Sequence, residues 1–395
     1  MPVALLALTL SAFAIGTTEF VIVGLVPTIA TDLGVSLPSA GLLVSLYAVG
    51  VAIGAPVLTA LTGRWNRKHV LLALMTLFVA GNLLAWQSPG YTTLIAARLL
   101  TGLAHGVFFS IGSTIATGLV PKNKEASAIA IMFTGLTVAL VTGVPLGTWI
   151  GQLYGWRATF LVVSVLGLIA LIGSALLIPS NLKQSRPSTL TEQFQVLVQP
   201  RLLLVYLITA LGYGGTFTAF TYLAPILEQE TGFAASATAI IMLVYGVSVT
   251  IGNIWGGKQA DKHGPITALS RIFGGLTLVL LVFTFTMSFK IAAVATVLVW
   301  GAFAFGNVPP LQVYVVQLAQ RFTPNAVDVA SGLNIAAFNI GIAIGSVTGG
   351  AIVEQLTLQD TTWLGALITF SALLLTRFSG HLDQRAAGNA IPSKA

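Results

Sequence analysis

Three ionisable side chains lie within long apolar stretches of the sequence: Glu19, Arg98 and His105. A charge is costly in an apolar environment and a buried carboxyl group favours its neutral form, so Glu19 can load and release a proton as its exposure alternates. His105 can do the same, because histidine titrates near physiological pH. The structural alternatives are a permanently paired or protonated Glu19, a hydrogen-bonded His105, and an Arg98 that binds backbone carbonyls. The functional interpretation predicts a proton-coupling site formed by these three residues.

A helix through the second of these stretches places Arg98, Gly102, His105 and Phe109 on one face. Arg98 and His105 are then separated by about 10 Å along the helix axis. Such a polar stripe fits the wall of a wet cavity better than a surface that faces lipid. Glu19, His105 and Phe109 are therefore also candidates for substrate binding.

Two asparagines, Asn334 and Asn339, lie in another apolar stretch. Each could bind substrate or only form a hydrogen bond with a neighbouring helix. Asp328 precedes them near the start of the same stretch, and we interpret it as a solvated residue at a helix start.

Small residues recur at every fourth position between 135 and 151: Gly135, Ala139, Gly143, Gly147 and Gly151. A flat stripe of this kind lets another helix backbone approach closely. Further stripes are expected at Ala337, Gly341, Gly345 and Gly349, at Gly50 and Gly54, and at Ser248, Gly252 and Gly256. Generic tight packing is one interpretation, and smooth surfaces on which two halves of the molecule rock are the favoured one.

The elements that must position these residues are membrane helices. Hydrophobic residues make up 56% of the chain and charged residues only 7%, whereas a soluble domain carries roughly 25% charged residues. The 395 residues contain no cysteine, which excludes disulfides, thiolate nucleophiles and cysteine metal sites. About 20 apolar residues cross a bilayer, so we expect an all-α polytopic membrane protein with twelve spans, at 4–29, 38–61, 69–87, 91–119, 125–150, 157–178, 201–226, 236–257, 266–288, 291–318, 326–352 and 362–379.

The basic residues give the orientation. With twelve spans, 15 of the 18 Lys and Arg residues fall on the side that holds both termini, whereas only Arg157 and Lys290 lie on the other side and Arg98 lies inside a span. Basic loops stay cytoplasmic, so both termini are expected in the cytoplasm. The net charge of +7 is then a topology signal, and no nucleic-acid partner is expected.

An internal repeat relates the two halves of the chain. Adding 198 to a residue number repeatedly gives a matching residue, as for Tyr47 and Tyr245 or Gly143 and Gly341. Six spans per half leave both halves in the same orientation, which is a parallel repeat about an axis along the membrane normal. We expect an N-terminal six-helix bundle at 1–178, a cytoplasmic linker at 179–200, a C-terminal bundle at 201–380 and a cytoplasmic tail at 381–395.

The repeat also shows that the embedded charged residues belong to the N-terminal half and that their counterparts in the C-terminal half are uncharged. Glu19, Arg98 and His105 correspond to Phe217, Thr296 and Phe303, which are uncharged. We therefore expect the N-terminal half to handle protons and the C-terminal half to offer substrate an apolar face. The candidates on that face are Tyr213, Phe217, Phe220 and Tyr222, although aromatic residues in membrane helices often contact only lipid or other helices.

The segment Gly257-Lys258-Gln259-Ala260-Asp261-Lys262-His263-Gly264 has the spacing of a G-x-x-x-D-[RK]-x-G loop. With this loop and three further motifs, the chain resembles the major facilitator superfamily, and specifically its twelve-helix drug:proton antiporter branch. An incomplete copy of this loop motif follows the second span, with Gly63 in place of the aspartate but with Arg64, Arg67 and Lys68 retained. Arg98-Leu99-Leu100-Thr101-Gly102 resembles the R-x-x-x-G motif, and Gly143-Val144-Pro145-Leu146-Gly147 resembles the antiporter motif, with its proline one place later than usual. The surroundings of Glu19, His105 and Asn339 are most similar to bacterial sugar- and arabinose-efflux-like permeases.

The resemblance implies a monomeric transporter of the bacterial plasma membrane that exports a small sugar-like or drug-like molecule in exchange for protons. It needs no cofactor, because the proton gradient supplies the energy. Its partners are the substrate, protons and the lipid bilayer. The resemblance also implies gating or conformational roles for Arg64, Arg67, Lys68, Gly143, Pro145, Gly147, Gly257, Asp261, Lys262 and Gly264.

Other functions stay open at this point. A proton-coupled importer or an uncoupled facilitator would share the same architecture. A receptor that does not transport would need a sizeable soluble domain, and the longest stretches outside the spans are the linker and the short tail. An enzyme is not expected, because the sequence has no His-Glu-x-x-His motif, no serine in a glycine-flanked turn and no Walker loop.

Overall fold

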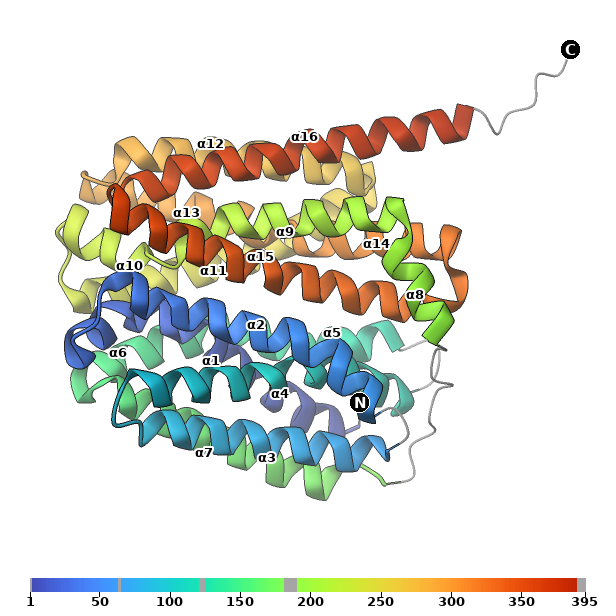
Figure 1. Ribbon diagram of the computed structural model, residues 1–395, viewed down its shortest axis with the longest axis horizontal. Coiled ribbons are helices and arrows are strands. Elements are labelled where there is room, and N and C mark those ends of the chain that lie inside the picture. Colours follow the sequence, from blue (N-terminus) through green and yellow to red (C-terminus); the bar gives the residue numbers. More distant parts are fainter. Residues whose placement is uncertain (1, 63–64, 121–124, 181–189, 389–395) are drawn as a thin grey trace, which may run out of the picture.

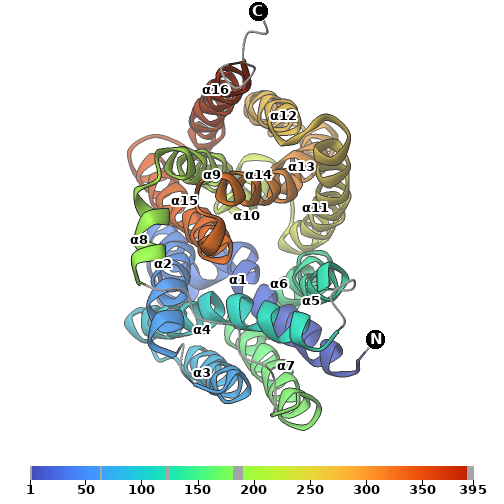
Figure 2. The same ribbon diagram turned by 90° about the vertical axis from the view of Figure 1, so that its right-hand side faces the viewer.

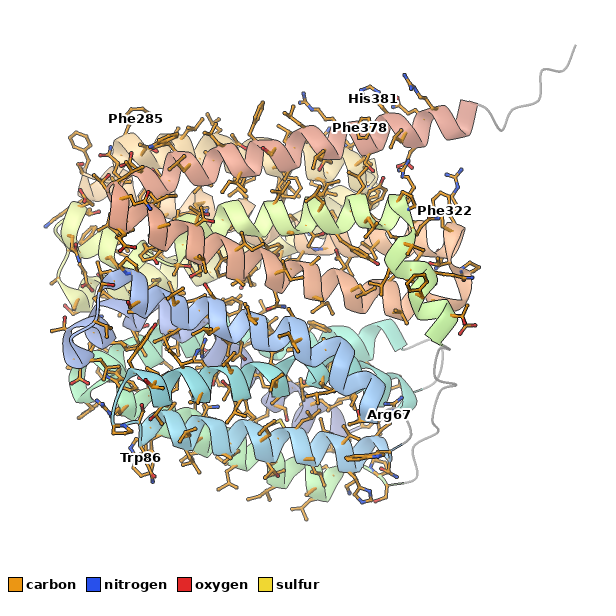
Figure 3. The ribbon with its side chains drawn as sticks, in the orientation of Figure 1. Arg67, Trp86, Phe285, Phe322, Phe378 and His381 are labelled. Atoms are coloured by element: carbon orange, nitrogen blue, oxygen red, sulfur yellow. The ribbon has the colours of Figure 1, made fainter. Side chains whose placement is uncertain are left out.

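A computed structural model describes residues 2–62, 65–120, 125–180 and 190–388. Twelve helices in this part of the chain are long and apolar enough to cross a membrane, which confirms the predicted fold class and number of spans. Figure 1 shows them packed side by side along the long axis of the molecule. Large apolar side chains such as Phe285 (76% exposed) and Phe378 (53% exposed) project from the outer surface (Figure 3), as expected of a surface that faces lipid.

The helices form two groups that occupy opposite sides of the molecule in both views and touch along a common boundary (Figures 1 and 2). The first group holds α1 (Ala4–Leu33), α2 (Leu37–Thr62), α3 (Arg67–Trp86), α4 (Tyr91–Gly118), α5 (Glu125–Val138), α6 (Val144–Tyr154) and α7 (Trp156–Leu177). The second group holds α9 (Pro200–Phe220), α10 (Leu223–Pro225), α11 (Ala235–His263), α12 (Pro265–Thr286), α13 (Lys290–Gly306), α14 (Val308–Phe322), α15 (Val327–Gln355) and α16 (Asp360–Gly388). A short helix, α8 (Leu190–Val198), precedes the second group. The domain boundaries proposed from the sequence stay a prediction.

Three spans expected as continuous helices are interrupted. A π-helical segment, Ala139–Gly143, separates α5 from α6 just before Pro145. The span expected at 201–226 is broken at Thr221 and Tyr222, between α9 and α10, and a second π-helical segment, Ile226–Glu230, follows Pro225 at the end of α10. The third break lies between α13 and α14 at Asn307, directly before a Val-Pro-Pro sequence. Proline removes a backbone donor and crowds the preceding turn, which explains why the breaks lie beside prolines.

The glycine stripes pack inside each half. A Cβ atom added at Gly147 would meet Val21 of α1, and one added at Gly345 would meet the backbone of Gly214 in α9. In the same way Gly54 lies against Leu103 of α4, and Gly252 lies against Ala302 of α13. The interpretation of these stripes as the surface between the halves is therefore wrong. Their physical role in this structure is the close approach of helices within one half.

The two halves meet instead near the end of the molecule that lies away from α8. The Ser45 hydroxyl donates to the Ala343 carbonyl at 3.0 Å, and the Ser346 hydroxyl donates to the Gly41 carbonyl at 3.0 Å. Gly246 of α11 faces the backbone of Leu140 in the other half. We call the end of the molecule with α8 the linker end and the other the far end; the two serine hydrogen bonds join α2 and α15 toward the far end.

The last helix is longer than predicted. The apolar pattern ends near residue 379, but α16 continues to Gly388. Asp383 in this extension accepts hydrogen bonds from Arg201 at 2.7 Å and from the Tyr314 hydroxyl at 2.8 Å. These partners lie on α9 and α14, so a polar cluster at the linker end holds a helical turn that the hydropathy pattern does not reveal.

Candidate functional site

The predicted proton-coupling residues meet in one cluster inside the first half. Glu19 comes from α1, and Arg98 and His105 come from α4. A fourth residue, Tyr47 of α2, completes the cluster. All four are buried, with exposed fractions of 7%, 1%, 5% and 1% in that order. Three helices thus converge on a group of ionisable side chains that lipid does not reach.

Arg98 joins α4 to the two neighbouring helices. Its guanidinium group donates to the carbonyl oxygens of Thr18 at 2.7 Å, Leu43 at 3.2 Å and Glu19 at 3.4 Å. The same group lies 4.2 Å from the centre of the Tyr47 ring, which is a cation–π contact. These hydrogen bonds all reach backbone oxygens, as the structural alternative for Arg98 predicts. A proton-coupling role for Arg98 stays a prediction.

Glu19, His105 and Tyr47 converge on a single ring nitrogen. The Nδ1 atom of His105 lies 3.8 Å from a Glu19 carboxyl oxygen and 3.1 Å from the Tyr47 hydroxyl. The first distance is an ion-pair contact when His105 is protonated, and the second is a hydrogen bond whose direction depends on the tautomer. The Glu19 carboxyl group and the imidazole are therefore close enough for an ion pair but not for a direct hydrogen bond, and the Tyr47 hydroxyl orients the ring.

The cluster continues into aromatic residues on both sides. The His105 ring lies 5.0 Å from Phe109, and Phe109 lies 4.9 Å from Phe133. On the other side Phe20, the neighbour of Glu19 in α1, lies 6.4 Å from Phe217 and 5.8 Å from Phe305 of the second half. Residues 19 and 20 thus connect the ionisable cluster to the aromatic residues of the other half.

Three of the four aromatic candidates of the second half belong to one aromatic cluster. The ring of Tyr213 lies 6.4 Å from Phe217 and 3.4 Å from Phe338, and Phe217 lies 5.3 Å from Phe220. Tyr222 lies apart from them, against Gly41 and Gly350 where the halves meet.

The two asparagine candidates of α15 have different surroundings. Asn334 accepts from the Thr209 hydroxyl at 2.7 Å and donates to Gln312 at 3.1 Å, and Gln312 donates in turn to Ser331. Asn339 donates to the Ile335 carbonyl at 3.0 Å, and its buried Oδ1 atom has no hydrogen-bond partner in the described part of the chain. Asn334 is therefore held in a network of hydrogen bonds, whereas Asn339 keeps a free acceptor.

The residues of the two loop motifs expected to act in gating lie at the linker end where they are described, whereas Gly143, Pro145 and Gly147 lie within the span formed by α5 and α6. Arg67 and Lys68 begin α3 (Figure 3 labels Arg67), and Lys262 lies in the last turn of α11. Gly264 ends that helix with a φ of 80°, a conformation that favours glycine. Gly257 lies against Pro309 of α14. Arg64 and the side chains of Asp261 and Asp328 lie outside the described residues.

Sequence reasoning missed several polar residues at the site. Tyr47 was identified only as the repeat partner of Tyr245, although a tyrosine in the middle of an apolar span could have marked it. Gln312 was hidden by the expectation of one continuous helix from 291 to 318. Tyr245 stacks on Phe220 with ring centres 4.8 Å apart, and Trp300 lies 5.8 Å from Tyr245. Tyr245 and Trp300 therefore belong to the same aromatic cluster as Tyr213, Phe217 and Phe220, although neither was predicted as a candidate.

Known proteins are similar to this chain in sequence and in fold. The family model described as Major Facilitator Superfamily matches residues 8–323. The MFS-type transporter YtbD of Bacillus subtilis is 53% identical over 97% of this chain and 96% of its own length. The inner membrane transport protein YdhP of Escherichia coli K12 is 40% identical over 95% of this chain and 96% of its own length. A solved structure of the nucleoside transporter NupG covers 95% of this chain and 99% of its own with a TM-score of 0.77 at 15% identity, and it supports the fold alone.

More distant relatives carry names that refer to drug resistance or to efflux. A chloramphenicol resistance protein of Streptomyces lividans is 33% identical over 95% of both chains. A "probable sugar efflux transporter" of Mannheimia succiniciproducens is 30% identical over 92% of this chain and 90% of its own length. With the family model and these relatives covering nearly the whole chain, the protein belongs to the major facilitator superfamily of transporters, as a multi-pass protein of a bacterial inner membrane.

Proposed function

We propose that the protein is a secondary antiporter that exports a small organic molecule in exchange for protons by alternating access. The observation that carries the proposal is the cluster of Glu19, His105, Tyr47 and Arg98, which is buried in the first half. Its member Glu19 directly precedes Phe20 in the sequence. Burying ionisable groups at this depth costs free energy, so such groups are rare and usually mark a functional site. The name of one relative, the probable sugar efflux transporter, supports the direction of transport.

Glu19 is the proton carrier in this mechanism. Its carboxyl group can lose a proton while the neighbouring Arg98 charge stabilises the resulting anion. Loss of access to water then favours the neutral acid again. Substrate and proton compete because the aromatic cluster that would receive substrate touches α1 through Phe20. Binding at one site therefore disturbs the helix that carries the other.

The contacts between the halves indicate which end of the molecule is closed in the conformation described here. The hydrogen bonds from Ser45 and Ser346 join the halves toward the far end. If the termini are cytoplasmic, as the basic loops predict, the far end faces outward and is the closed one. In this state the cytoplasm is the side from which substrate would enter and to which a proton would be released.

Substrate-induced proton release from detergent-solubilised protein tests the proposal. Chloramphenicol and a hexose are added to weakly buffered samples, and the change in pH is recorded for the wild type, Glu19→Gln and Glu354→Gln. Glu354 is an exposed acid at the far end and serves as the matched control. We expect one of the two compounds to release protons from the wild type and the control but not from Glu19→Gln. Equal release from all three proteins would show that Glu19 is structural, and binding without any release would favour an uncoupled facilitator.

A further inference from the structure

The aromatic cluster of the second half contains hydrogen-bond donors that the protein leaves unused. We define this aromatic cluster by its members: Tyr213, Phe217, Phe220, Tyr245, Trp300, Phe305 and Phe338. Within the described part of the chain, the hydroxyl groups of Tyr213 and Tyr245 and the Nε1 atom of Trp300 have no hydrogen-bond partner. Their residues are 0%, 2% and 0% exposed. Buried polar groups are nearly always paired, so three unpaired groups in one cluster call for a partner that is not part of the chain.

The internal repeat provides a comparison within the same molecule. Tyr47 and Tyr245 occupy equivalent positions in the two halves. The Tyr47 hydroxyl is paired with His105 and its ring is covered by Arg98, whereas the ring of Tyr245 is covered by Phe220 and its hydroxyl is unpaired. The fold therefore does not require this hydroxyl to be unsatisfied. The difference comes from the side chains around it, which in the second half are aromatic.

The three groups lie along one continuous path from the interface between the halves. Phe20 of the first half contacts Phe217 and Phe305, and Tyr213 contacts both of these. Phe217 leads to Phe220, which contacts Tyr245 and Trp300. Phe20, where this path begins, is the neighbour of Glu19 in α1. The unpaired groups are thus connected to the proton-coupling cluster and not isolated in an unrelated part of the core.

The chemistry of the cluster selects among possible ligands. Aromatic faces and edges favour a flat apolar body, which can stack between them. The indole N–H can only donate, and an unpaired phenol hydroxyl also donates readily, so the ligand must supply acceptor oxygens or nitrogens. A sugar would bury many hydroxyl groups against rings that cannot pair with them. A cation would face the positive ends of the N–H and O–H groups, and no member of the cluster carries a negative charge.

We propose that Tyr213, Tyr245 and Trp300 form a substrate subsite for uncharged aromatic molecules that carry hydrogen-bond acceptors such as carbonyl, amide or nitro oxygens. This inference rests on the proposed export function and specifies its substrate class. The subsite holds the acceptor group of the ligand, and Phe217 and Phe220 pack against its ring. Asn339, with its free Oδ1 atom on α15, is not required for the subsite.

Isothermal titration calorimetry at one pH, without any gradient, tests the substrate class. The uncharged probes are 4-nitrobenzamide and chloramphenicol, and the comparison probes are glucose and benzyltrimethylammonium. The last has an aromatic ring and a positive charge but no acceptor. We expect both uncharged probes to bind the wild type at least tenfold more tightly than the comparison probes. Equal or tighter binding of glucose or of the cation, or no binding of either uncharged probe, would overturn the assignment.

Phenylalanine variants test the residues. Tyr213→Phe and Tyr245→Phe remove one hydroxyl each and keep the ring, and each is expected to weaken binding of the uncharged probes about three- to tenfold, the effect of one lost hydrogen bond. Neither should lower the melting temperature of the protein without ligand, because the deleted hydroxyl has no partner to lose. Trp300→Phe tests the indole donor but also removes volume, so the two tyrosine variants carry the conclusion if it does not fold.

Tyr206→Phe is the matched control, because its buried hydroxyl donates to the Ala330 carbonyl at 3.2 Å. It should lower the melting temperature and leave probe affinity unchanged. Unchanged affinity in both cluster variants, or a fall in their melting temperatures equal to that of Tyr206→Phe, would refute the subsite. The result is independent of coupling: if the wild type binds a probe without releasing protons while Tyr245→Phe loses affinity, the antiport mechanism fails and the subsite stands.

Discussion

Gly246 offers a direct test of whether the halves separate at the far end during transport. A Cβ atom at this position would lie 2.9 Å from the Cα atom of Val141, which is 0.5 Å inside the 3.4 Å at which ordinary contact begins, and the Leu140 carbonyl oxygen would be closer still. Both neighbours are backbone atoms of the other half, so no side chain can turn away to make room. Gly246→Ala must therefore push the halves apart or distort one of them.

The expected size follows from the cost of overpacking, which is about 1–3 kcal/mol. Because the overlap exists only while the halves touch at Gly246, this energy raises the population of the state that is open at the far end by roughly 5- to 150-fold. The chain has no cysteine, so pairs of spin labels can be attached without removing native residues. Exposed positions suit this purpose: Thr31 with Glu354 at the far end, and His69 with Gln320 at the linker end.

Double electron–electron resonance should show a longer distance for the first pair and a shorter one for the second in Gly246→Ala than in the unmodified protein. Gly214→Ala is the control, because its Cβ atom would lie 3.5 Å from the nearest atom, which is ordinary contact within one half. Unchanged distances in a folded Gly246→Ala protein would refute the idea that the contact near Leu140 belongs to one conformation only.

Three further predictions concern coupling, stability and topology. His105→Asn should shift the pH midpoint of transport without abolishing coupling, because Glu19 still binds the proton; a complete loss of proton release in titrations of this variant would move the carrier role to His105. Asp383→Asn should lower the melting temperature measured by nano-format fluorimetry by an amount equivalent to about 1 kcal/mol, since the ion pair with Arg201 is partly exposed and screened; an unchanged value would mean that the pair does not hold the end of α16. A cysteine introduced at Lys258 should react with an impermeant maleimide only from the cytoplasm and one at Glu354 only from outside, and labelling of both from the same side would contradict the predicted orientation.

The spans were predictable from sequence because the bilayer imposes a simple rule. A run of about 20 apolar residues is visible without knowledge of any contact, and each of the twelve runs corresponds to a span in the structure. The breaks at Ala139–Gly143 and at Asn307 were not foreseen, since apolar residues continue through them and only the nearby prolines mark them. The helix α8 was missed because nine residues in a polar linker are too short for a periodic pattern to stand out.

The candidate site was predictable only in part, because the sequence shows unusual residues but not the groups that they contact. A buried charge such as Arg98 is conspicuous in an apolar sequence, but its partners are backbone carbonyls, which every residue has. The glycine stripe of Gly143 was interpreted correctly as a surface of close approach, yet sequence does not say which helix approaches. The unpaired state of Tyr245 depends on what lies beyond its hydroxyl group in three dimensions, and no local pattern encodes that.

The adjacency of Glu19 and Phe20 in α1 limits how such a transporter can be altered. The side chain of residue 19 lies in the ionisable cluster of the first half, and that of residue 20 lies against Phe217 and Phe305 in the second. If the proposed function holds, aromatic residues deeper in the second half can be exchanged to change what is recognised without touching the cluster that carries the acid. Phe20 is different, because its replacement would change both the proposed substrate surface and the packing of the helix turn that carries Glu19. In a programme of directed evolution, new specificities should therefore arise readily at Tyr245 or Phe220, whereas changes at residue 20 should alter specificity and proton coupling together.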